Sequence, residues 1–397
     1  MATLSKKRIE SIDILRGLIM VVMALDHTRD FFHSTAWTDD PLNLKTTTAA
    51  LFFTRFITHF CAPLFVFLSG TSIYLQSLRK SPKELFIFLL TRGLWLIFLE
   101  VTVVTIGETF NFHLGLIILQ VIWVIGASMV LLAFVQKLPF PFIFTLGSCI
   151  VLGHNLLDFP ERAPDFHAGF WWELLYHARF ATYPLAPGHI LAIVYPLLPW
   201  FGLMLMGYCF GVFFTDTYTV EQRSLLFKKI GLGLWVFFIV LRFLNVYGDP
   251  YPWKVQQDGF HTFLSFLKVH KYPPSLLYMC LTVGGGMLAL SFLENRKNGF
   301  TEILRRFGRV ALFYYLLHWY ILHGLAFAYF HFHGHTEALA DELNHTIPMR
   351  YVVPADGLPL PIIYAIWLCF ILCFYPLCKG YDRYKTRHPE NRWLSYL

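Results

Sequence analysis

The chain has 397 residues, of which 56% are apolar, 18% aromatic and 14% charged, with a formal net charge of +7. Soluble domains carry about 25% charged residues, so a soluble protein of this composition would lack the polar surface that keeps it in solution. The composition excludes a cytosolic enzyme, a disordered chain and a disulfide-stapled secreted domain, and it indicates a polytopic helical membrane protein.

Ten apolar stretches follow one another along the chain, and each is long enough to cross a bilayer core of about 30 Å. They cover residues 12–32, 49–75, 85–106, 114–135, 140–157, 190–214, 230–246, 274–293, 310–330 and 360–378. No soluble domain or internal repeat separates these stretches. We therefore predict an all-α polytopic integral membrane protein whose ten transmembrane helices form a single domain over residues 1–397.

The distribution of positive charge sets the expected orientation, because cytoplasmic loops of membrane proteins are enriched in lysine and arginine. With the N-terminus placed inside, 20 of the 32 Lys and Arg residues fall in inside segments, 7 in outside loops and 5 within the spans. This asymmetry predicts that both termini are cytoplasmic. It also assigns the net positive charge to topology, so we expect membrane lipid and no nucleic acid as a partner.

The densest group of ionisable residues closes the first predicted helix, where Asp26, His27, Arg29, Asp30 and His33 occur within eight residues. Charges inside a bilayer are costly and usually functional. On a helix, Asp30 is the i+3 neighbour of His27, and a carboxylate bound to one imidazole nitrogen makes the other nitrogen a better base. We predict a functional site here, with Arg29 keeping the carboxylates ionised. A polar helix end that caps itself with ion pairs is the simpler alternative.

Further polar residues occur within other predicted spans and suggest one polar cavity. Arg55 and His59 share a face of the second span and are expected to bind substrate, whereas helix–helix hydrogen bonding is the alternative for each residue alone. Candidates in the remaining spans are Arg92, Glu100, Tyr314, Tyr315 and His318.

Two loops predicted to lie outside, residues 154–189 and 331–358, are rich in histidine and carboxylates. We expect Trp171, Trp172 and His189 to contact a hydrophilic substrate, with an interfacial aromatic belt as the alternative. The histidine run at residues 331–335 has no fixed partner residue, so we expect no metal site.

The segment from Asp13 to Gly17 reads D-x-L-R-G, and His27 follows 14 residues after Asp13. This pattern resembles the transmembrane acyltransferase superfamily, and more closely the bacterial branch of the heparan-alpha-glucosaminide N-acetyltransferase catalytic-domain family. Supporting strings span nearly the whole chain and lie at residues 24–32, 63–70, 91–94, 195–200, 272–275 and 308–318.

The resemblance implies a membrane-embedded enzyme that takes an acyl group, in relatives acetyl, from cytoplasmic acyl-CoA. The acceptor would be an amine or hydroxyl of an extracytoplasmic sugar or glycan, so both N- and O-acetyltransferase activity stay open. It further implies a bacterial inner-membrane location and allows a homodimer. Direct transfer to the acceptor is our hypothesis, and a ping-pong route through an acyl-histidine is the variant.

The same resemblance places His27 at the position of the catalytic histidine of the superfamily, and His33 near a second histidine of the family. Both remain candidates for the base, and Arg29, His33 or His318 would stabilise the oxyanion. Arg92 resembles an arginine on the CoA side of the superfamily, although Trp95 replaces the second arginine of that motif. Since CoA carries several phosphates, the residues expected to bind it are Arg92, Arg305, Arg306, Arg309, Tyr315 and His318.

Two other classes of function compete with the enzyme. The cluster of Asp26, His27, Arg29 and Asp30, with Arg55 and His59 nearby, would also suit the relay of a proton-coupled secondary transporter. No inverted repeat is evident, which disfavours that interpretation. A scaffold or sensor without chemistry would have no reason to carry the buried charges.

Overall fold

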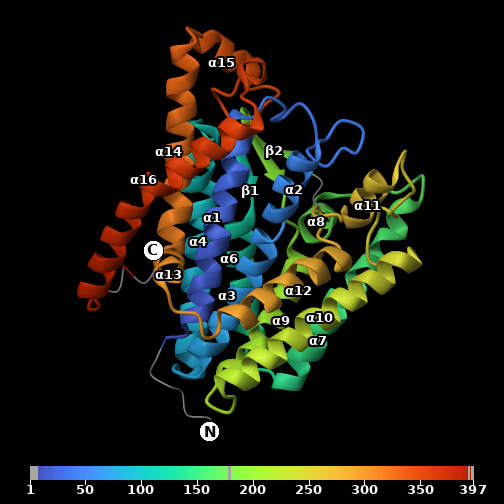
Figure 1. Cartoon of the computed structure of the whole chain (residues 1–397), viewed down its shortest axis with the longest axis vertical. Helices are drawn as coiled ribbons and strands as arrows, with labels where there is room; N and C mark the ends of the chain where they lie inside the picture. The colour runs from blue at the N-terminus through green and yellow to red at the C-terminus, as the bar shows by residue number, and fades with distance from the viewer. Residues whose placement is uncertain (1–7, 178–179, 392–393, 395–397) are drawn as a thin grey trace. The chain divides into compact units, whose positions relative to one another are not determined.

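The computed structural model describes residues 8–177, 180–391 and 394. The chain forms two compact units that alternate along the sequence. The first unit contains Ala62–Val101 and Ile118–Arg296, and the second contains Asp13–Cys61, Thr102–Ile117 and Lys297–Leu397. Figure 1 shows that helices make up most of both units.

The first unit holds most of the membrane-length helices and most of the small sheet. Its helices are α3 (Cys61–Ser77), α4 (Pro82–Leu99), α6 (Val121–Val135), α7 (Phe140–Gly153), α8 (Phe170–Leu175), α9 (Leu197–Phe210), α10 (Val220–Leu244), α11 (Gly259–Leu267) and α12 (Leu276–Leu293). Helix α10 packs along α12, α4 along α6, and α7 along α9 (Figure 1). Polar caps begin several of these helices; Ser81 and Glu84, for example, form a capping box at α4.

The second unit is built around α1 (Glu10–Phe32), which carries the charge cluster. Its other helices are α2 (Ala49–Thr58), α5 (Thr105–Thr109), α13 (Gly299–Arg309), α14 (Ala311–Phe332), α15 (Glu337–Leu343) and α16 (Leu360–Arg387). Helix α13 packs against α14 and α16 in this unit.

Glycines let the backbones of α1 and α13 touch. A methyl group on Gly17 would lie 1.8 Å from the carbonyl oxygen of Leu304, and one on Gly308 would lie 1.8 Å from that of Asp13. Arg16 reaches across the contact, 3.1 Å from the Asp13 carboxylate and 3.5 Å from the Gly308 carbonyl. The D-x-L-R-G segment therefore builds a helix crossing.

A three-stranded sheet corrects the all-α prediction. Its strands are β1 (Leu116–Leu119), β2 (Ala181–Ala186) and β3 (His189–Ile193), in the order β1-β3-β2, with β2 and β3 antiparallel and Ala181 opposite Ile193. The predicted spans 114–135 and 190–214 were therefore wrong at their starts, where strands precede α6 and α9. A short apolar run such as β1 suits a strand or a buried helix equally well, and Pro196 separates β3 from α9.

Eight segments of the described chain are long and apolar enough to cross a membrane, and they make this an integral membrane protein. They match eight of the ten predicted spans. The remaining two are α1, which carries several charges, and α6, which has 15 residues. The count of ten and the cytoplasmic placement of both termini stay predictions, and residues 1–7 and 395–397 lie outside the described chain.

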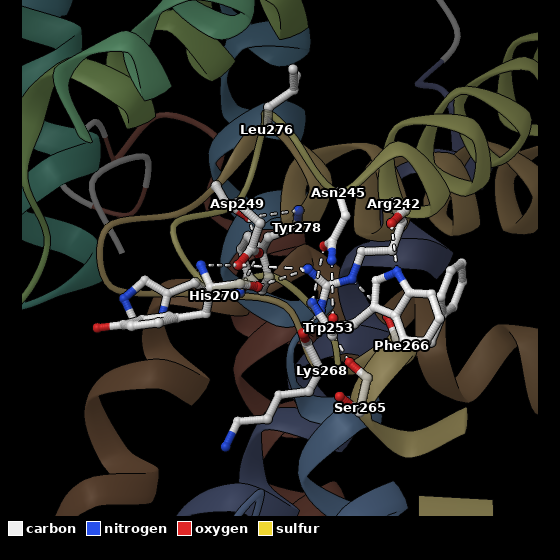
Figure 2. Close-up of polar contacts among 12 residues, drawn as sticks. Arg242, Asn245, Asp249, Trp253, Ser265, Phe266, Lys268, His270, Leu276 and Tyr278 are labelled. Carbon is white, nitrogen blue, oxygen red and sulfur yellow. Dashed lines mark hydrogen bonds and ion pairs between the residues drawn. The ribbon is translucent and has the colours of Figure 1, made fainter. Parts of the chain in front are cut away.

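Two charged residues that the sequence places within spans have structural partners in the first unit. Glu100, at the start of a π-helical turn (Glu100–Val104), accepts from the backbone N–H groups of Gln120 (3.2 Å) and Trp123 (3.0 Å), which begin α6. Arg242, near the end of α10, donates to four backbone carbonyls of the segment that leads to α12, as Figure 2 shows.

The Arg242 contacts hold the segment between α10 and α12 in one conformation. The four acceptors, at 2.6–3.0 Å, belong to Tyr251, Ser265, Phe266 and Lys268. Trp253 donates through its indole N–H to the Arg242 carbonyl at 2.8 Å.

Asp249, in the same segment, adds further contacts to those of Arg242. Its carboxylate lies 3.8 Å from Arg242 and accepts from His270 N at 2.9 Å (Figure 2). It also accepts from Ser275 Oγ at 2.9 Å. Burial raises the pKa of the Asp249 carboxyl above its usual value, against the lowering effect of Arg242. Arg242 thus acts as a tertiary clamp.

Candidate active site

Four charged side chains of α1 and α2 form a nearly neutral network in the second unit, in which Asp26 and Arg29 are buried and Asp30 and Arg55 partly exposed. One guanidinium nitrogen of Arg29 contacts Asp26 at 3.1 Å and Asp30 at 2.6 Å. Arg55 binds the other carboxylate oxygen of Asp26. Both oxygens of Asp26 are therefore held by arginines, and Asp30 keeps one oxygen for another partner. This arrangement brings together three of the predicted catalytic residues with the predicted substrate-binding Arg55.

His27 presents one ring nitrogen to that second oxygen of Asp30. Nδ1 of His27 lies 3.6 Å from Oδ2 of Asp30, and the two side chains are 15% and 21% exposed. The contact is looser than a hydrogen bond, as is common for catalytic pairs before substrate binds. A proton on Nδ1, facing the carboxylate, leaves the lone pair of Nε2 free to accept a proton.

Two residues of α14 lie against the His27 ring. The ring centroids of His27 and Trp319 are 4.1 Å apart, and those of His27 and His318 are 5.1 Å apart. His318 and Trp319 are almost fully buried. Nδ1 of His318 faces the Tyr315 carbonyl, so the ring carries its proton there. Within the described structure, His318 Nε2 and the Trp319 indole N–H have no hydrogen-bond partner.

Unpartnered buried polar atoms are rare in folded proteins, and here an acceptor and a donor of this kind flank one imidazole. The neutral tautomer of His318 offers a lone pair at Nε2, so it suits a proton acceptor better than the predicted oxyanion donor. The Trp319 indole N–H can donate a hydrogen bond but does not give up its proton. Sequence reasoning missed Trp319, although its position directly after an intramembrane histidine was a usable signal.

His33 has the opposite hydrogen-bonding pattern to His27. Its Nδ1 accepts from the backbone N–H of Thr35 at 3.2 Å and lies 3.0 Å from the Thr35 hydroxyl. Burial, and then the charge of Arg29, lower the pKa of His33. The neutral ring therefore carries its proton on Nε2 and acts there as a donor. Of the two histidines left open by the sequence, His27 has the geometry of a base.

The other predicted residues of the second unit lie elsewhere on the same helices. His59 is buried at the C-cap of α2, one turn beyond Arg55. Tyr315 is buried on α14 and offers its carbonyl to His318.

The three arginines of α13 are paired with carboxylates but remain partly exposed. Arg305 and Arg306 share Glu302, at 2.7 Å and 3.0 Å, and Arg309 contacts Asp382 at 2.9 Å. Three cations against two carboxylates leave a net positive charge. The group thus fits a phosphate ligand in charge and access.

Four predicted binding residues belong to the first unit. Trp171 is 69% exposed, whereas Trp172 donates its indole N–H to Glu161 at 2.6 Å. His189 begins β3, and Arg92 is half-buried on α4. Among the described residues, no group of three or more potential ligands could hold a metal ion.

The chain has helices of membrane length, a carboxylate–histidine pair and an arginine network. These features define a polytopic membrane protein with a candidate acid–base site. A family model described as "Heparan-alpha-glucosaminide N-acetyltransferase, catalytic" matches residues 8–247, which is more than half of the chain. The chain belongs to this family of membrane acetyltransferases, as the sequence motifs predicted. A comparison with curated proteins finds no match. The matched region contains His27 and its carboxylates, and it ends before His318 and Trp319.

Proposed function

We propose that the protein transfers an acetyl group from acetyl-CoA to an amine or hydroxyl group of a sugar, with His27 as general base. The observation that supports this most is the pairing of His27 with Asp30, which leaves Nε2 of the imidazole for the acceptor. Membership of the acetyltransferase family supports the reaction class over a proton-coupled transporter.

In the proposed step, His27 Nε2 removes the proton of the acceptor amine or hydroxyl as that atom attacks the thioester carbonyl carbon. The tetrahedral intermediate collapses by breaking the carbon–sulfur bond. The proton on His27 then passes to the thiolate, so that CoA leaves as the thiol and the base is restored. Asp30 stabilises the imidazolium between the two proton transfers.

The oxyanion of the intermediate needs a donor that is fixed before the reaction. Arg29 already divides its contacts between two carboxylates. The Trp319 indole N–H lies beside His27 without a partner. We assign the oxyanion contact to Trp319, in place of the three donors expected from sequence.

The arginines of α13 would bind the phosphates of CoA, because they place three partly exposed guanidinium groups close together. Under the orientation predicted from charge, this group lies on the cytoplasmic side and the sugar arrives from the opposite side, in a bacterial inner membrane. Arg92 and the first-unit residues Trp171, Trp172 and His189 remain candidates for donor and acceptor binding, respectively.

The test uses purified full-length protein in proteoliposomes, with acetyl-CoA and glucosamine, and follows release of the CoA thiol. His27→Ala should lower kcat by about 10²–10⁴-fold, the usual effect of losing a general base, while acetyl-CoA still raises Tm. A variant that keeps more than about a tenth of the wild-type rate would refute His27 as base.

Two further outcomes separate the alternatives. Uptake of a small solute driven by a proton gradient, with no effect of acetyl-CoA, would support the transporter instead. Radiolabelled acetyl-CoA without acceptor distinguishes the routes, since labelled protein appears only if an acyl-histidine forms.

A further inference from the structure

A short helix with an exposed aromatic face lies between α10 and α12 in the chain of the first unit. This helix, α11, contains no Asp, Glu, Lys or Arg in its sequence GFHTFLSFL. Phe260 and Phe263 are 45% and 50% exposed. Leu267, on the same helical face, is half-buried, whereas Leu264 is buried inside the unit. An exposed apolar face of this kind marks an interaction surface.

The exposed face of α11 continues the lipid-facing surface of α10. Helix α10 is one of the candidate membrane spans, and only a minor part of it is buried within the protein. Near its end, Phe243 is 64% exposed, and its ring centroid lies 4.9 Å from that of Phe266 in α11. The ring of Trp253 lies 5.8 Å from Phe266. Because α11 packs against the apolar end of a membrane span, the lipid that surrounds α10 also reaches α11.

Side chains pair backbone groups at both ends of α11, as surroundings with little water require. A helix of nine residues leaves a large share of its N–H and C=O groups without partners inside the helix. At the N-terminal end, the Asp258 carboxylate accepts from the His261 N–H at 2.8 Å. At the C-terminal end, Arg242 donates to the carbonyls of Ser265, Phe266 and Lys268 (Figure 2).

The stretch that leads into α11 is also paired by side chains. The Asn245 amide donates to the Trp253 carbonyl and accepts from the Trp253 N–H, each at 3.0 Å. The Ser265 hydroxyl accepts from the Lys254 N–H at 3.1 Å. In a loop surrounded by water, the solvent would satisfy these groups. Their pairing within the protein suits a segment that lies partly in lipid.

The residues beside α11 are those typical of a membrane interface. Tyr251 is exposed, and the indole N–H of Trp253 donates to the Arg242 carbonyl; tyrosine and tryptophan concentrate at the level of lipid headgroups. Lys254 is exposed before α11, and Lys268 is its C-cap residue. Figure 2 shows the Lys268 side chain pointing away from Arg242. Lysines on either side of an apolar helix can reach the phosphates of lipids.

We propose that α11 is an interfacial helix that binds phospholipid. The face formed by Phe260, Phe263 and Leu267 lies among the upper acyl chains of one leaflet, and Lys254 and Lys268 lie at the level of the lipid phosphates. The segment between the predicted spans 230–246 and 274–293 is then an anchor in the membrane surface and no loop in water. Arg242 holds this anchor in place by pairing the carbonyls at its C-terminal end.

The experiment measures the depth of α11 with the full-length protein in vesicles of phosphatidylethanolamine and phosphatidylglycerol. A nitroxide is attached through p-acetylphenylalanine in place of Phe263, so the native cysteines stay, and its collisions with oxygen and with a water-soluble nickel chelate report its depth. We expect this label about 5–10 Å below the lipid phosphates. The control label replaces Gln257, an exposed residue before α11, and should lie at or above the phosphates.

Four results would overturn the proposal. Frequent collisions of the label at position 263 with the nickel chelate would place α11 in water, and a depth near the bilayer centre would place it too deep. A label shielded from both reagents would mean that protein covers this face, and spin–spin broadening that persists on dilution with lipid would identify that protein as a second copy. The unmodified protein gives an independent readout. A phospholipid with a photoreactive diazirine near the top of its acyl chain should label residues 259–267 as well as α10, and labelling of α10 alone is the fourth contrary result.

Discussion

Asp30→Asn keeps the shape of the side chain and removes the charge that faces His27. At an effective dielectric constant of about 20, unit charges 3.6 Å apart attract by about 4.6 kcal/mol. Both side chains are partly exposed, and Arg29 also contacts the Asp30 carboxylate at 2.6 Å. We therefore take about half of this attraction, ~2 kcal/mol, as the stabilisation of the imidazolium. The imidazolium forms only during the reaction, so we expect a loss of about 30-fold in kcat.

The assay is release of CoA thiol under single-turnover conditions, with saturating acetyl-CoA and a series of acceptor concentrations. Asp26→Asn is the matched comparison, because Asp26 lies one helical turn away and both of its oxygens contact arginines. That variant breaks contacts which join α1 to α2, so its main effect should be a lower Tm. Asp30→Asn should therefore lower mainly kcat, whereas Asp26→Asn should lower mainly Tm.

Two results would refute this reasoning. Asp30→Asn could retain more than about a third of the wild-type kcat, which would mean that the carboxylate does not stabilise the imidazolium. Alternatively, the two variants could lose kcat and Tm in equal proportion, which would make Asp30 a structural residue of the arginine network.

Other positions test the fold and the site separately. Gly308→Ala should lower Tm sharply, because the methyl group would lie 1.8 Å from the Asp13 carbonyl oxygen; an unchanged Tm would contradict the tight helix crossing. Arg242→Met should cost about 3–5 kcal/mol by leaving a buried carboxylate unpaired, and limited proteolysis should then cut residues 245–275 faster. The pKa of His33 is lowered from 6.5 in the folded protein, so the unfolded chain takes up the proton first and stability falls as pH drops below about 6.5. His33→Gln should weaken that dependence without abolishing it, because other buried histidines of the chain remain, as followed by Tm from pH 8 to 5. Trp319→Phe should lower kcat about 100-fold with little change in KM; a normal kcat would exclude the indole N–H as the oxyanion donor.

The positions of the helices were predictable because a membrane span depends on one local quantity, the length of an apolar run. The errors occur where that quantity is ambiguous. The run Leu116–Leu119 is apolar and adjoins α6, so hydropathy merges the two, while the chain forms a strand. Left-handed residues at Phe110 and Leu114 turn the backbone before it, and neither residue type signals such a conformation.

The candidate site was predictable in the part that one helix builds. Helical spacing brings Asp30 to His27 and Arg29 to Asp26, and the structure has both pairs. The contacts from other helices could not be predicted from the sequence, since Trp319 and His318 lie almost 300 residues after His27. Their approach depends on how α14 packs, and a single sequence contains no local signal for that packing.

The arginines within the predicted spans show why the free-energy cost of burying a charge does not by itself identify a functional residue. The rule that intramembrane charge is costly singles out Arg16, Arg29, Arg55 and Arg242 alike. Arg242 donates mainly to backbone carbonyls. Arg16 donates to the Gly308 carbonyl of α13 and to the Asp13 carboxylate of its own helix. Such contacts hold elements together and leave no group poised to react.

Arg29 and Arg55 contact carboxylates instead, and their contacts leave one carboxylate oxygen without an arginine. They occupy both oxygens of Asp26 but only one oxygen of Asp30. The remaining oxygen faces Nδ1 of His27, which has no hydrogen-bond partner among the described residues. A network that neutralises its charges yet leaves one carboxylate oxygen against a histidine has the form of a base that is oriented in advance. This residual contact, more than the number of buried charges, is the physical ground for proposing catalysis at the C-terminal end of α1.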